Sequence, residues 1–347
     1  AKRGAKVTVL ERGVAGGEAS WAGGGILCAL PPWQYSAPVT RLVLWSEQLY
    51  PGWVEDLLAT TGIDPEYTRS GLLMLPDFER ETARNWCREH LVECVPVQSA
   101  DICPRIALDA GALWLPQVAQ VRNPRLIKAL KRGLQIAGGK VLEHTEVKAW
   151  KISRNQLAGV VTPRGEFSAA GYIVCGGAWS QHITGNFSLG LDIRPVRGQM
   201  LLYKTPPGFL SCVVLQNHVY LIPRKDGHIL VGSTVEDAGF DSSTTEEAKR
   251  ELMARAARLF PPLTEKLLVQ QWAGLRPGSR DNIPAIDRHP QLQNLYINSG
   301  HYRYGMTMAP GSARILANLV SGISQPLDTS AYRWPASSTA AVLKAVL

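Results

Sequence analysis

The stretch Val7-Thr8-Val9-Leu10-Glu11 is a short apolar run, rich in β-branched residues, that ends in an acid. Such a run predicts a strand, and Gly4 just before it suits the end of a helix. In a βαβ nucleotide-binding unit, the acid that closes the second strand hydrogen-bonds a ribose hydroxyl. The stretch therefore predicts the second half of a nucleotide-binding unit, with Glu11 as the ribose-binding acid.

The glycine-rich turn of such a unit lies roughly 20 residues before the acid, and the sequence contains no GxGxxG motif. Two interpretations stay open. Either roughly 25–30 residues with the first strand and its turn precede residue 1, or the dinucleotide interpretation is wrong. A missing central strand would leave its neighbours with unpaired backbone groups, which favours the first expectation.

Residues 16–26 are crowded with small side chains, including Gly16, Gly17 and the run Gly23-Gly24-Gly25. Glycines let backbone N–H groups approach a ligand closely, as flat rings and pyrophosphates require. A flexible linker is the alternative, but Trp21 and Ile26 make the stretch too apolar for one. We therefore expect this segment to lie along a cofactor.

Length and charge restrict the class of protein. A chain of 347 residues is expected to form two interlocked domains, and 45% hydrophobic with 19% charged residues is typical of a globular protein. The excess of 37 Lys and Arg over 29 Asp and Glu is scattered, without a run of five basic residues. This pattern favours an enzyme that attracts anionic substrates over a nucleic-acid-binding protein.

The six cysteines form no CxxC pair and no zinc spacing. They are interpreted as reduced thiols of a cytoplasmic protein without a metal site. No apolar run reaches the roughly 18 residues that span a bilayer, and no signal peptide is visible. The sequence therefore predicts a cytoplasmic protein without a membrane span.

Hydrophobic periodicity predicts a mixed fold, in which helices alternate with strands before and after a central run of short strands. Helices are expected at 39–58 (broken by Pro51), 77–91, 123–137, 246–260, 313–322 and 340–347. Strands are expected at 67–75, 140–142, 151–162, 167–174, 199–203, 212–215, 218–222, 228–231 and 295–298. The strands between residues 193 and 230 favour an antiparallel sheet that could roof a bound ring, with a hairpin turn at 224–227.

Three further runs carry chemical signals. In residues 272–281, Arg276 lies between Gly-Leu and Pro-Gly, a tight element that suits bidentate capture of a carboxylate. Residues 300–306 form a glycine-flanked turn before a helix, where backbone N–H groups could hold an anion or a ring edge. Residues 174–180 end a strand in small side chains, again where a sheet would meet a cofactor.

Together with residues 7–12 and 19–26, these runs resemble the D-amino-acid oxidase superfamily of FAD-dependent oxidoreductases, and within it the glycine oxidases. The resemblance follows chain order from Val7 to about Gly322. It implies an α/β and α+β fold, with a Rossmann-like FAD-binding domain of the GR2 type and an antiparallel-sheet substrate domain. The expected FAD-binding domain comprises residues 1–62, 123–192 and 268–347, and the substrate-binding domain comprises 63–122 and 193–267.

The resemblance also implies roles for single residues. The substrate contacts would be Arg276, which grips the carboxylate, together with Tyr220 and Arg303. The FAD contacts would be Glu11, Arg12, Glu18, Ala19, Gly23, Gly24, Gly25, Val147, His301, Tyr302, Arg303, Tyr304, Gly305, Met306 and Thr307. Each has a simpler alternative: Arg276 alone could equally be a salt-bridged surface arginine, and Tyr220 a core tyrosine. His218 and His301 are more often structural, because no Ser, Cys or Asp partner is evident.

The activity implied by the resemblance needs no catalytic side chain beyond the flavin. A small amino acid (glycine, sarcosine or D-alanine) would be oxidised to an imine that hydrolyses to an oxoacid and ammonia. Dioxygen would then yield hydrogen peroxide, in a homotetramer that serves thiamine (thiazole) biosynthesis. Two alternatives remain: a flavin dehydrogenase subunit that passes electrons to a quinone or partner, like a hydrogen cyanide synthase component, and a catalytically silent flavoprotein subunit.

Overall fold

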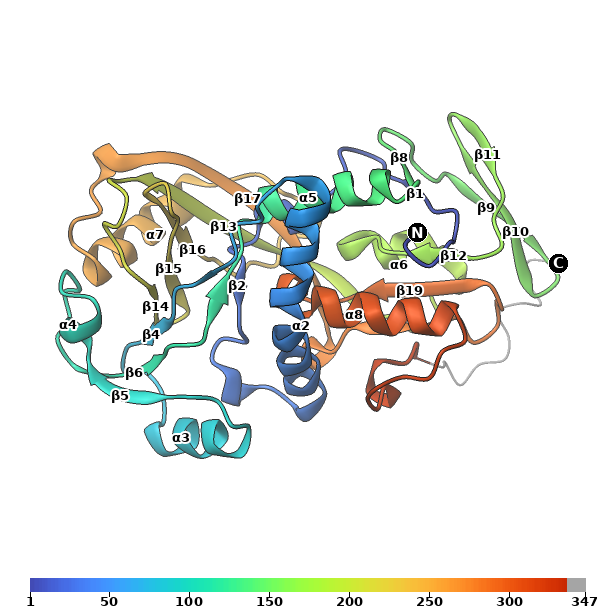
Figure 1. Ribbon diagram of the computed structural model, residues 1–347. Helices are drawn as coiled ribbons and strands as arrows, with labels where there is room; N and C mark the ends of the chain where they lie inside the picture. The colour runs from blue at the N-terminus through green and yellow to red at the C-terminus, as the bar shows by residue number, and fades with distance from the viewer. Residues whose placement is uncertain (336–347) are drawn as a thin grey trace.

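A computed structural model describes residues 1–335 of the chain (Figure 1). Its largest element is an eight-stranded sheet in which only the β14–β4 pair is parallel. The strands, in spatial order, are β17 (Leu268–Ser279), β13 (Ile193–Lys204), β16 (His228–Gly232), β15 (Val219–Pro223), β14 (Val213–Gln216), β4 (Leu72–Met74), β6 (Gly111–Leu115) and β5 (Val95–Gln98). This sheet is the antiparallel sheet that the central run of short strands predicts.

Helix α7 (Glu246–Leu259) covers one face of the large sheet. Its predicted inner stripe of Leu252, Ala256 and Leu259 is buried with Tyr203 and Val231 of the sheet in one core cluster. The helix begins where the Thr245 hydroxyl accepts a hydrogen bond from the backbone N–H of Ala248, as an N-cap residue does. Periodicity therefore predicts this helix correctly.

The structure also has four smaller sheets. Strand β1 (Thr8–Leu10) pairs in parallel with β8 (Lys140–Leu142), and β12 (Tyr172–Val174) pairs in parallel with β19 (Leu295–Ser299), which also pairs with β18 (Ala285–Arg288). The other two sheets are β11-β10-β9 and β2-β7-β3, with β9 (Ala149–Ser153), β10 (Gln156–Thr162), β11 (Gly165–Phe167), β2 (Ile26–Leu27), β7 (Ala119–Gln120) and β3 (Thr68–Arg69). The three sheets that contain β1, β10 and β12 lie on the right of Figure 1, whereas β2 lies between the large sheet and α2 (Ala37–Thr61).

The α5 helix (Asn123–Ile136) leads directly into β8, which lies beside β1 in register with Val9 opposite Val141. A helix followed by a strand parallel to β1 is the arrangement expected of a nucleotide-binding unit. The strand predicted at residues 7–11 is therefore confirmed, as is the mixed α/β and α+β fold.

Two long helices, α2 (Ala37–Thr61) and α8 (Gly305–Val320), pack side by side in the centre of Figure 1. The predicted break of the first helix at Pro51 is wrong. The helix continues because its face with Tyr50, Val54 and Leu57 is buried against α5 and neighbouring strands, and tertiary packing outweighs the local cost of proline. Helix α8 also begins eight residues earlier than the helix predicted at 313–322, and it includes Pro310.

Three predicted strands are divided in the structure. Residues 67–75 form β3 and β4 on either side of Gly71, whose φ is +67° and whose added Cβ would lie inside the Trp114 ring. Residues 151–162 turn at Arg154, with φ +56°, and belong to β9 and β10. Residues 167–174 belong to β11 and β12. The hydrophobic pattern of one segment does not reveal these turns, because each turn contains few of the polar residues that mark turns in a sequence.

The remaining helices are short: α1 (Ala19–Ala22), α3 (Arg80–Glu89), α4 (Ser99–Ile102) and α6 (Ser180–Thr184), with 3-10 turns at Pro32–Gln34, Gly177–Trp179, Gly185–Phe187, Glu265–Leu267, Arg280–Asn282 and Ser330–Tyr332. The helix predicted at 340–347 lies outside the described residues. Within residues 1–335, no helix is both long and apolar enough to cross a membrane.

The predicted domain boundaries stay a prediction. One observation bears on them: β17 pairs along nearly its whole length with β13, from Ile193 opposite Ser279 to Tyr203 opposite Leu268. A boundary at residue 268 assigns these two paired strands to different domains.

Candidate active site

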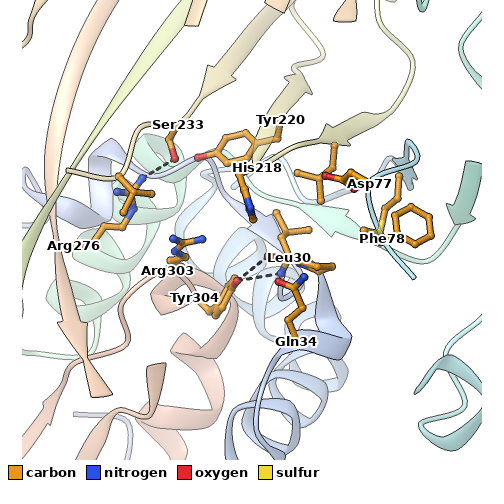
Figure 2. A pocket seen from close by; sticks show the side chains of 14 residues that line it. Leu30, Gln34, Asp77, Phe78, His218, Tyr220, Ser233, Arg276, Arg303 and Tyr304 are labelled. Atoms are coloured by element: carbon orange, nitrogen blue, oxygen red, sulfur yellow. Dashed lines mark hydrogen bonds between the residues drawn. The ribbon is translucent and has the colours of Figure 1, made fainter. Parts of the chain in front are cut away.

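A cavity of about 140 Å³ opens between the large sheet, the turn before α8 and the loop around Leu30. Figure 2 shows Arg276, Arg303, Tyr220 and Tyr304 directed toward this cavity from three different elements. The apolar part of its lining consists of Leu30, Pro31, Met74, Phe78, Leu215 and Val235. The structure thus brings together the three residues predicted to bind substrate, which lie as much as 83 positions apart (303 − 220).

The Arg276 side chain projects from β17 and lies flat across the neighbouring strand. Its Nη2 donates to Ser233 Oγ at 2.7 Å, and its Nη1 donates to the carbonyl oxygens of Arg197 and Thr234, each at 3.2 Å. The guanidinium occupies the space above Gly198, where an added Cβ would lie 2.1 Å from both terminal nitrogens. Arg276 is therefore fixed by neutral acceptors.

No carboxylate of residues 1–335 forms a salt bridge with either Arg276 or Arg303. Two cationic side chains without acidic partners thus face the same small cavity (Figure 2). A guanidinium in a partly desolvated site favours a carboxylate ligand, because its fork of N–H donors matches the two oxygens. The two guanidinium groups therefore suit an anionic ligand; the acid that also lines the cavity, Asp77, accepts a hydrogen bond from the Asn217 N–H.

Tyr220 lies in β15 with its hydroxyl 3.3 Å from the Met200 sulfur. An added Cβ at Gly24 would lie 3.3 Å from the Tyr220 ring, so the ring faces the glycine-rich stretch. Tyr220 therefore lies where the cavity meets that stretch. His218, from the same hairpin, also lines the cavity.

The turn of residues 300–306 is tied to β17 by two hydrogen bonds. The Tyr302 backbone N–H donates to the Pro277 carbonyl at 3.0 Å, and the Ser279 hydroxyl donates to the Gly300 carbonyl at 2.5 Å. The Tyr304 hydroxyl closes the other side of the turn, where it accepts from the Leu30 N–H at 3.2 Å and contacts the Tyr35 hydroxyl. Two runs that the sequence singled out separately thus form one side of the cavity.

His301 of the same turn points into the protein. Its Nε2 lies 2.9 Å from the Ser312 hydroxyl, and burial lowers its pKa to about 4, so the imidazole is neutral at pH 7. Thr307 is also buried, and its hydroxyl donates to the Ile26 carbonyl at 3.1 Å. These contacts connect α8 to the segment that follows the glycines.

The glycine run 23–25 packs too closely for any larger residue. At Gly25, with φ +76°, an added Cβ would lie 2.2 Å from the Val121 carbonyl oxygen. The Gly24 carbonyl accepts a hydrogen bond of 2.7 Å from Arg224, a buried side chain that also donates to the Val121 carbonyl and to Gln120. Burial lowers the pKa of Arg224 to about 10, so it remains a cation at neutral pH.

Glu11, Arg12 and Glu18 gather at the carboxyl end of β1. The Glu11 carboxylate accepts from the Gly13 N–H at 2.8 Å, and Arg12 forms a salt bridge of 2.7 Å with Glu18. The Arg12 guanidinium also lies 3.7 Å from the centre of the Trp179 ring, just beyond β12. Ligands of open α/β sheets bind at this edge, outside the carboxyl ends of parallel strands. Val147 lies farther along, packed against the core cluster of β12 and β19.

The sequence interpretation missed the residues that hold Arg276. Ser233 and Thr234 follow β16, and Arg197 lies in β13, so they meet Arg276 only through sheet pairing. No local pattern signals such contacts, because they depend on strands far apart in the chain.

Comparison with known proteins identifies the family. The model of the FAD dependent oxidoreductase family (DAO) matches residues 1–319. The chain belongs to that family. Glycine oxidase from Pseudomonas aeruginosa is 44% identical over 335 residues, covering 95% of this chain and 92% of the relative.

Two further similarities extend the comparison of this FAD-dependent oxidoreductase. The crystal structure of glycine oxidase from Geobacillus kaustophilus has a TM-score of 0.90 at 29% identity, covering 96% of this chain and 92% of that one. The bifunctional protein ThiO/ThiG from Synechocystis is 32% identical, covering 91% of this chain and 47% of that protein.

FAD is the cofactor of this oxidoreductase, and the described residues fit such a group. At Gly24 and Gly25 the backbone packs directly against Ile222 and Val121, so this stretch presents a bare glycine backbone beside the cavity residue Tyr220. The carboxylate of Glu11 lies at the carboxyl end of a parallel strand pair, the edge where ligands of open α/β sheets bind, and the turn at residues 300–306 leads into a helix of 16 residues. The cavity lies between this turn and the large sheet.

Proposed function

We propose that this FAD-dependent oxidoreductase oxidises glycine or another small amino acid, such as sarcosine or D-alanine, with Arg276 as the anchor of the substrate carboxylate. The observation that carries the proposal is the position of Arg276. Its guanidinium is held by three neutral acceptors, has no acidic partner within residues 1–335, and faces a cavity of about 140 Å³. Similarity to several glycine oxidases supports this substrate class.

In this proposal the residues position the substrate, while the flavin, when bound, accepts a hydride from the α-carbon. Arg276 holds the carboxylate, which directs the α-carbon C–H bond toward the cofactor. The positive charge of Arg303 favours the neutral form of the substrate amine, which is the form that can release electrons. The imine then hydrolyses to the oxoacid and ammonia, and dioxygen is reduced to hydrogen peroxide.

The cofactor roles of single residues stay proposals. We propose that Glu11 and Arg12 bind the ribose end, that Glu18, Ala19 and Gly23–Gly25 lie along the pyrophosphate and flavin, and that Val147 contacts the adenine end. His301–Thr307 would surround the flavin ring, in which case the inward-pointing His301 and the buried Thr307 side chains support the turn and its backbone makes the contact.

We further propose a place in thiamine (thiazole) biosynthesis, a cytoplasmic location and a homotetramer. The similarity to the ThiO half of a ThiO/ThiG protein supports the first. Light scattering of the purified protein would determine the oligomeric state.

The decisive experiment is the flavin absorption spectrum before and after glycine is added without oxygen. We expect the flavin band to bleach, and dioxygen to restore it with release of hydrogen peroxide. Bleaching without reaction with dioxygen would indicate a dehydrogenase, and no bleaching by any small amino acid would contradict the proposal. A panel of amino acids would test the substrate range, and preference for a large D-amino acid would contradict the small-substrate assignment.

A further inference from the structure

Glu236 lies beside the active site without lining the cavity, in the segment between β16 and α7. Its carboxylate accepts hydrogen bonds from Arg197 Nε at 2.8 Å and from Gln199 Nε2 at 2.9 Å, and it also contacts the Thr234 hydroxyl. Its backbone pairs with that of Arg197 in both directions, at 2.9 and 3.0 Å. One carboxylate therefore holds β13 and the segment after β16 together.

Two of the residues held in this way are those that fix Arg276. The Arg276 guanidinium donates to the carbonyl oxygens of Arg197 and Thr234, and its third acceptor, Ser233, is the neighbour of Thr234. Figure 2 shows the contact between Arg276 and Ser233 at the edge of the cavity. Glu236 is thus connected to Arg276 through one intervening residue, which is either Thr234 or Arg197.

Few other groups near Arg197 and Gln199 could replace the negative charge of Glu236. Gln199 is fully buried and Arg197 is 8% exposed. Burial raises the pKa of Glu236, but hydrogen bonds from Thr234, Arg197 and Gln199 outweigh it, and the net pKa is below its ordinary value. Glu236 is therefore ionised at neutral pH. The only other carboxylate near Arg197 in the described part of the chain is Asp241, whose side chain is 55% exposed.

We propose that Glu236 is a positioning residue for Arg276, which sets the carboxylate-binding geometry of the site without touching the substrate. The inference rests on the proposed function, in which Arg276 binds the substrate carboxylate. Loss of the Glu236 charge would free Thr234 and Arg197 to shift, and the acceptors of the Arg276 guanidinium would move with them. Substrate binding would weaken, while the electron transfer that follows binding would change little.

The test compares Glu236→Gln with Asp241→Asn in the FAD-loaded protein. Both substitutions remove a charge next to Arg197, but only Glu236 also contacts Thr234 and Gln199, and exposed ion pairs contribute little. We expect Glu236→Gln to raise the KM for glycine and the Kd for acetate, measured by titration calorimetry, about 10-fold, with kcat within about 3-fold. Asp241→Asn should change each value by less than about 2-fold. Equal effects of the two substitutions would overturn the inference.

A double-mutant cycle separates positioning from general loss of structure. If Glu236 acts through Arg276, Glu236→Gln should cause no further loss of acetate affinity in an Arg276→Met background. Additive losses would overturn the inference. If Glu236→Gln fails to fold, Thr234→Val removes the hydroxyl contact with Glu236, together with the acceptor of the Gln199 N–H, without a change of charge. It should raise the Kd for acetate about 3-fold, and an unchanged Kd would overturn the inference. Normal glycine KM in Arg276→Met would instead refute the proposed function.

Discussion

Two ionisable side chains, Arg276 and His301, come from the two runs that form one side of the cavity and point in opposite directions. The run at residues 272–281 directs Arg276 into the cavity, with neutral acceptors behind it and no acidic partner within residues 1–335. The run at residues 300–306 turns His301 inward, where it is neutral and paired with Ser312. A titratable side chain within a functional motif can thus serve either the ligand or the fold. Substitutions of Arg276 should therefore change substrate binding, and substitutions of His301 should change the pH dependence of stability.

The largest expected effect is that of Arg276→Ala on substrate binding. Removal of one partner of a desolvated charge pair costs about 2–5 kcal/mol, so we expect kcat/KM for glycine to fall about 10²-fold or more, mainly through KM. The flavin should still bind, because the side chain belongs to the large sheet. Steady-state kinetics and the flavin spectrum would measure both. Unchanged kinetics would refute the role of Arg276.

His301 should instead affect stability in acid. Its pKa is about 4 in the folded protein, whereas the ordinary histidine value of 6.5 applies to the unfolded chain. Between these two pH values the unfolded chain therefore binds more protons than the folded protein. Stability is fully retained above pH 6.5 and is lost as the pH falls toward 4, by about 3 kcal/mol at most. Urea unfolding at pH 7, 5.5 and 4 would measure the loss.

The control for that measurement is His301→Asn, which keeps a polar side chain near Ser312 but does not titrate. Its free energy of unfolding should depend less on pH than that of the parent protein, and its KM for glycine should change little. Identical pH dependence in both proteins would show that the imidazole is not the source of the acid sensitivity.

A smaller effect is expected from Gly198→Ala, which tests whether the position of the Arg276 guanidinium determines substrate binding. The new Cβ would lie 2.1 Å from both terminal nitrogens of Arg276, so the guanidinium has to move. We expect the KM for glycine to rise about 10-fold, which corresponds to about 1.4 kcal/mol of lost binding. Gly274→Ala, which meets Ala22 instead, is the matched control on the opposite strand. If both variants raise KM equally, displacement of Arg276 is not the cause, because the Gly274 variant displaces α1 instead.

Local sequence patterns predicted the elements that depend on local interactions. Helices α5 and α7 follow from their apolar stripes, and β1 follows from the run that ends at Glu11. Helix α2 was predicted to break at Pro51, because the packing that keeps it continuous lies in other parts of the chain. The division of residues 67–75 at Gly71 likewise depends on Trp114, which is 43 positions away (114 − 71).

The same distinction applies to the site. The tight Gly-Leu-Arg-Pro-Gly run indicated Arg276 as a carboxylate ligand, and the structure places it in the cavity. Its supporting residues Ser233 and Thr234 could not be predicted, since they reach Arg276 only because β13 lies between β16 and β17. The roles of Tyr220 and Arg303 came from resemblance alone, and sequence patterns without that resemblance would have left Tyr220 as a core residue.

Arg224 gives the two halves of the molecule a mechanical connection. From the turn after β15 it donates to the carbonyl oxygens of Gly24 and Val121, and it is almost completely buried. Any sliding of the large sheet over the glycine-rich stretch would strip a buried cation of its acceptors, and each lost hydrogen bond to a charged group costs about 1–3 kcal/mol. At this point, hydrogen bonds from one buried cation therefore oppose any displacement of the sheet relative to the stretch.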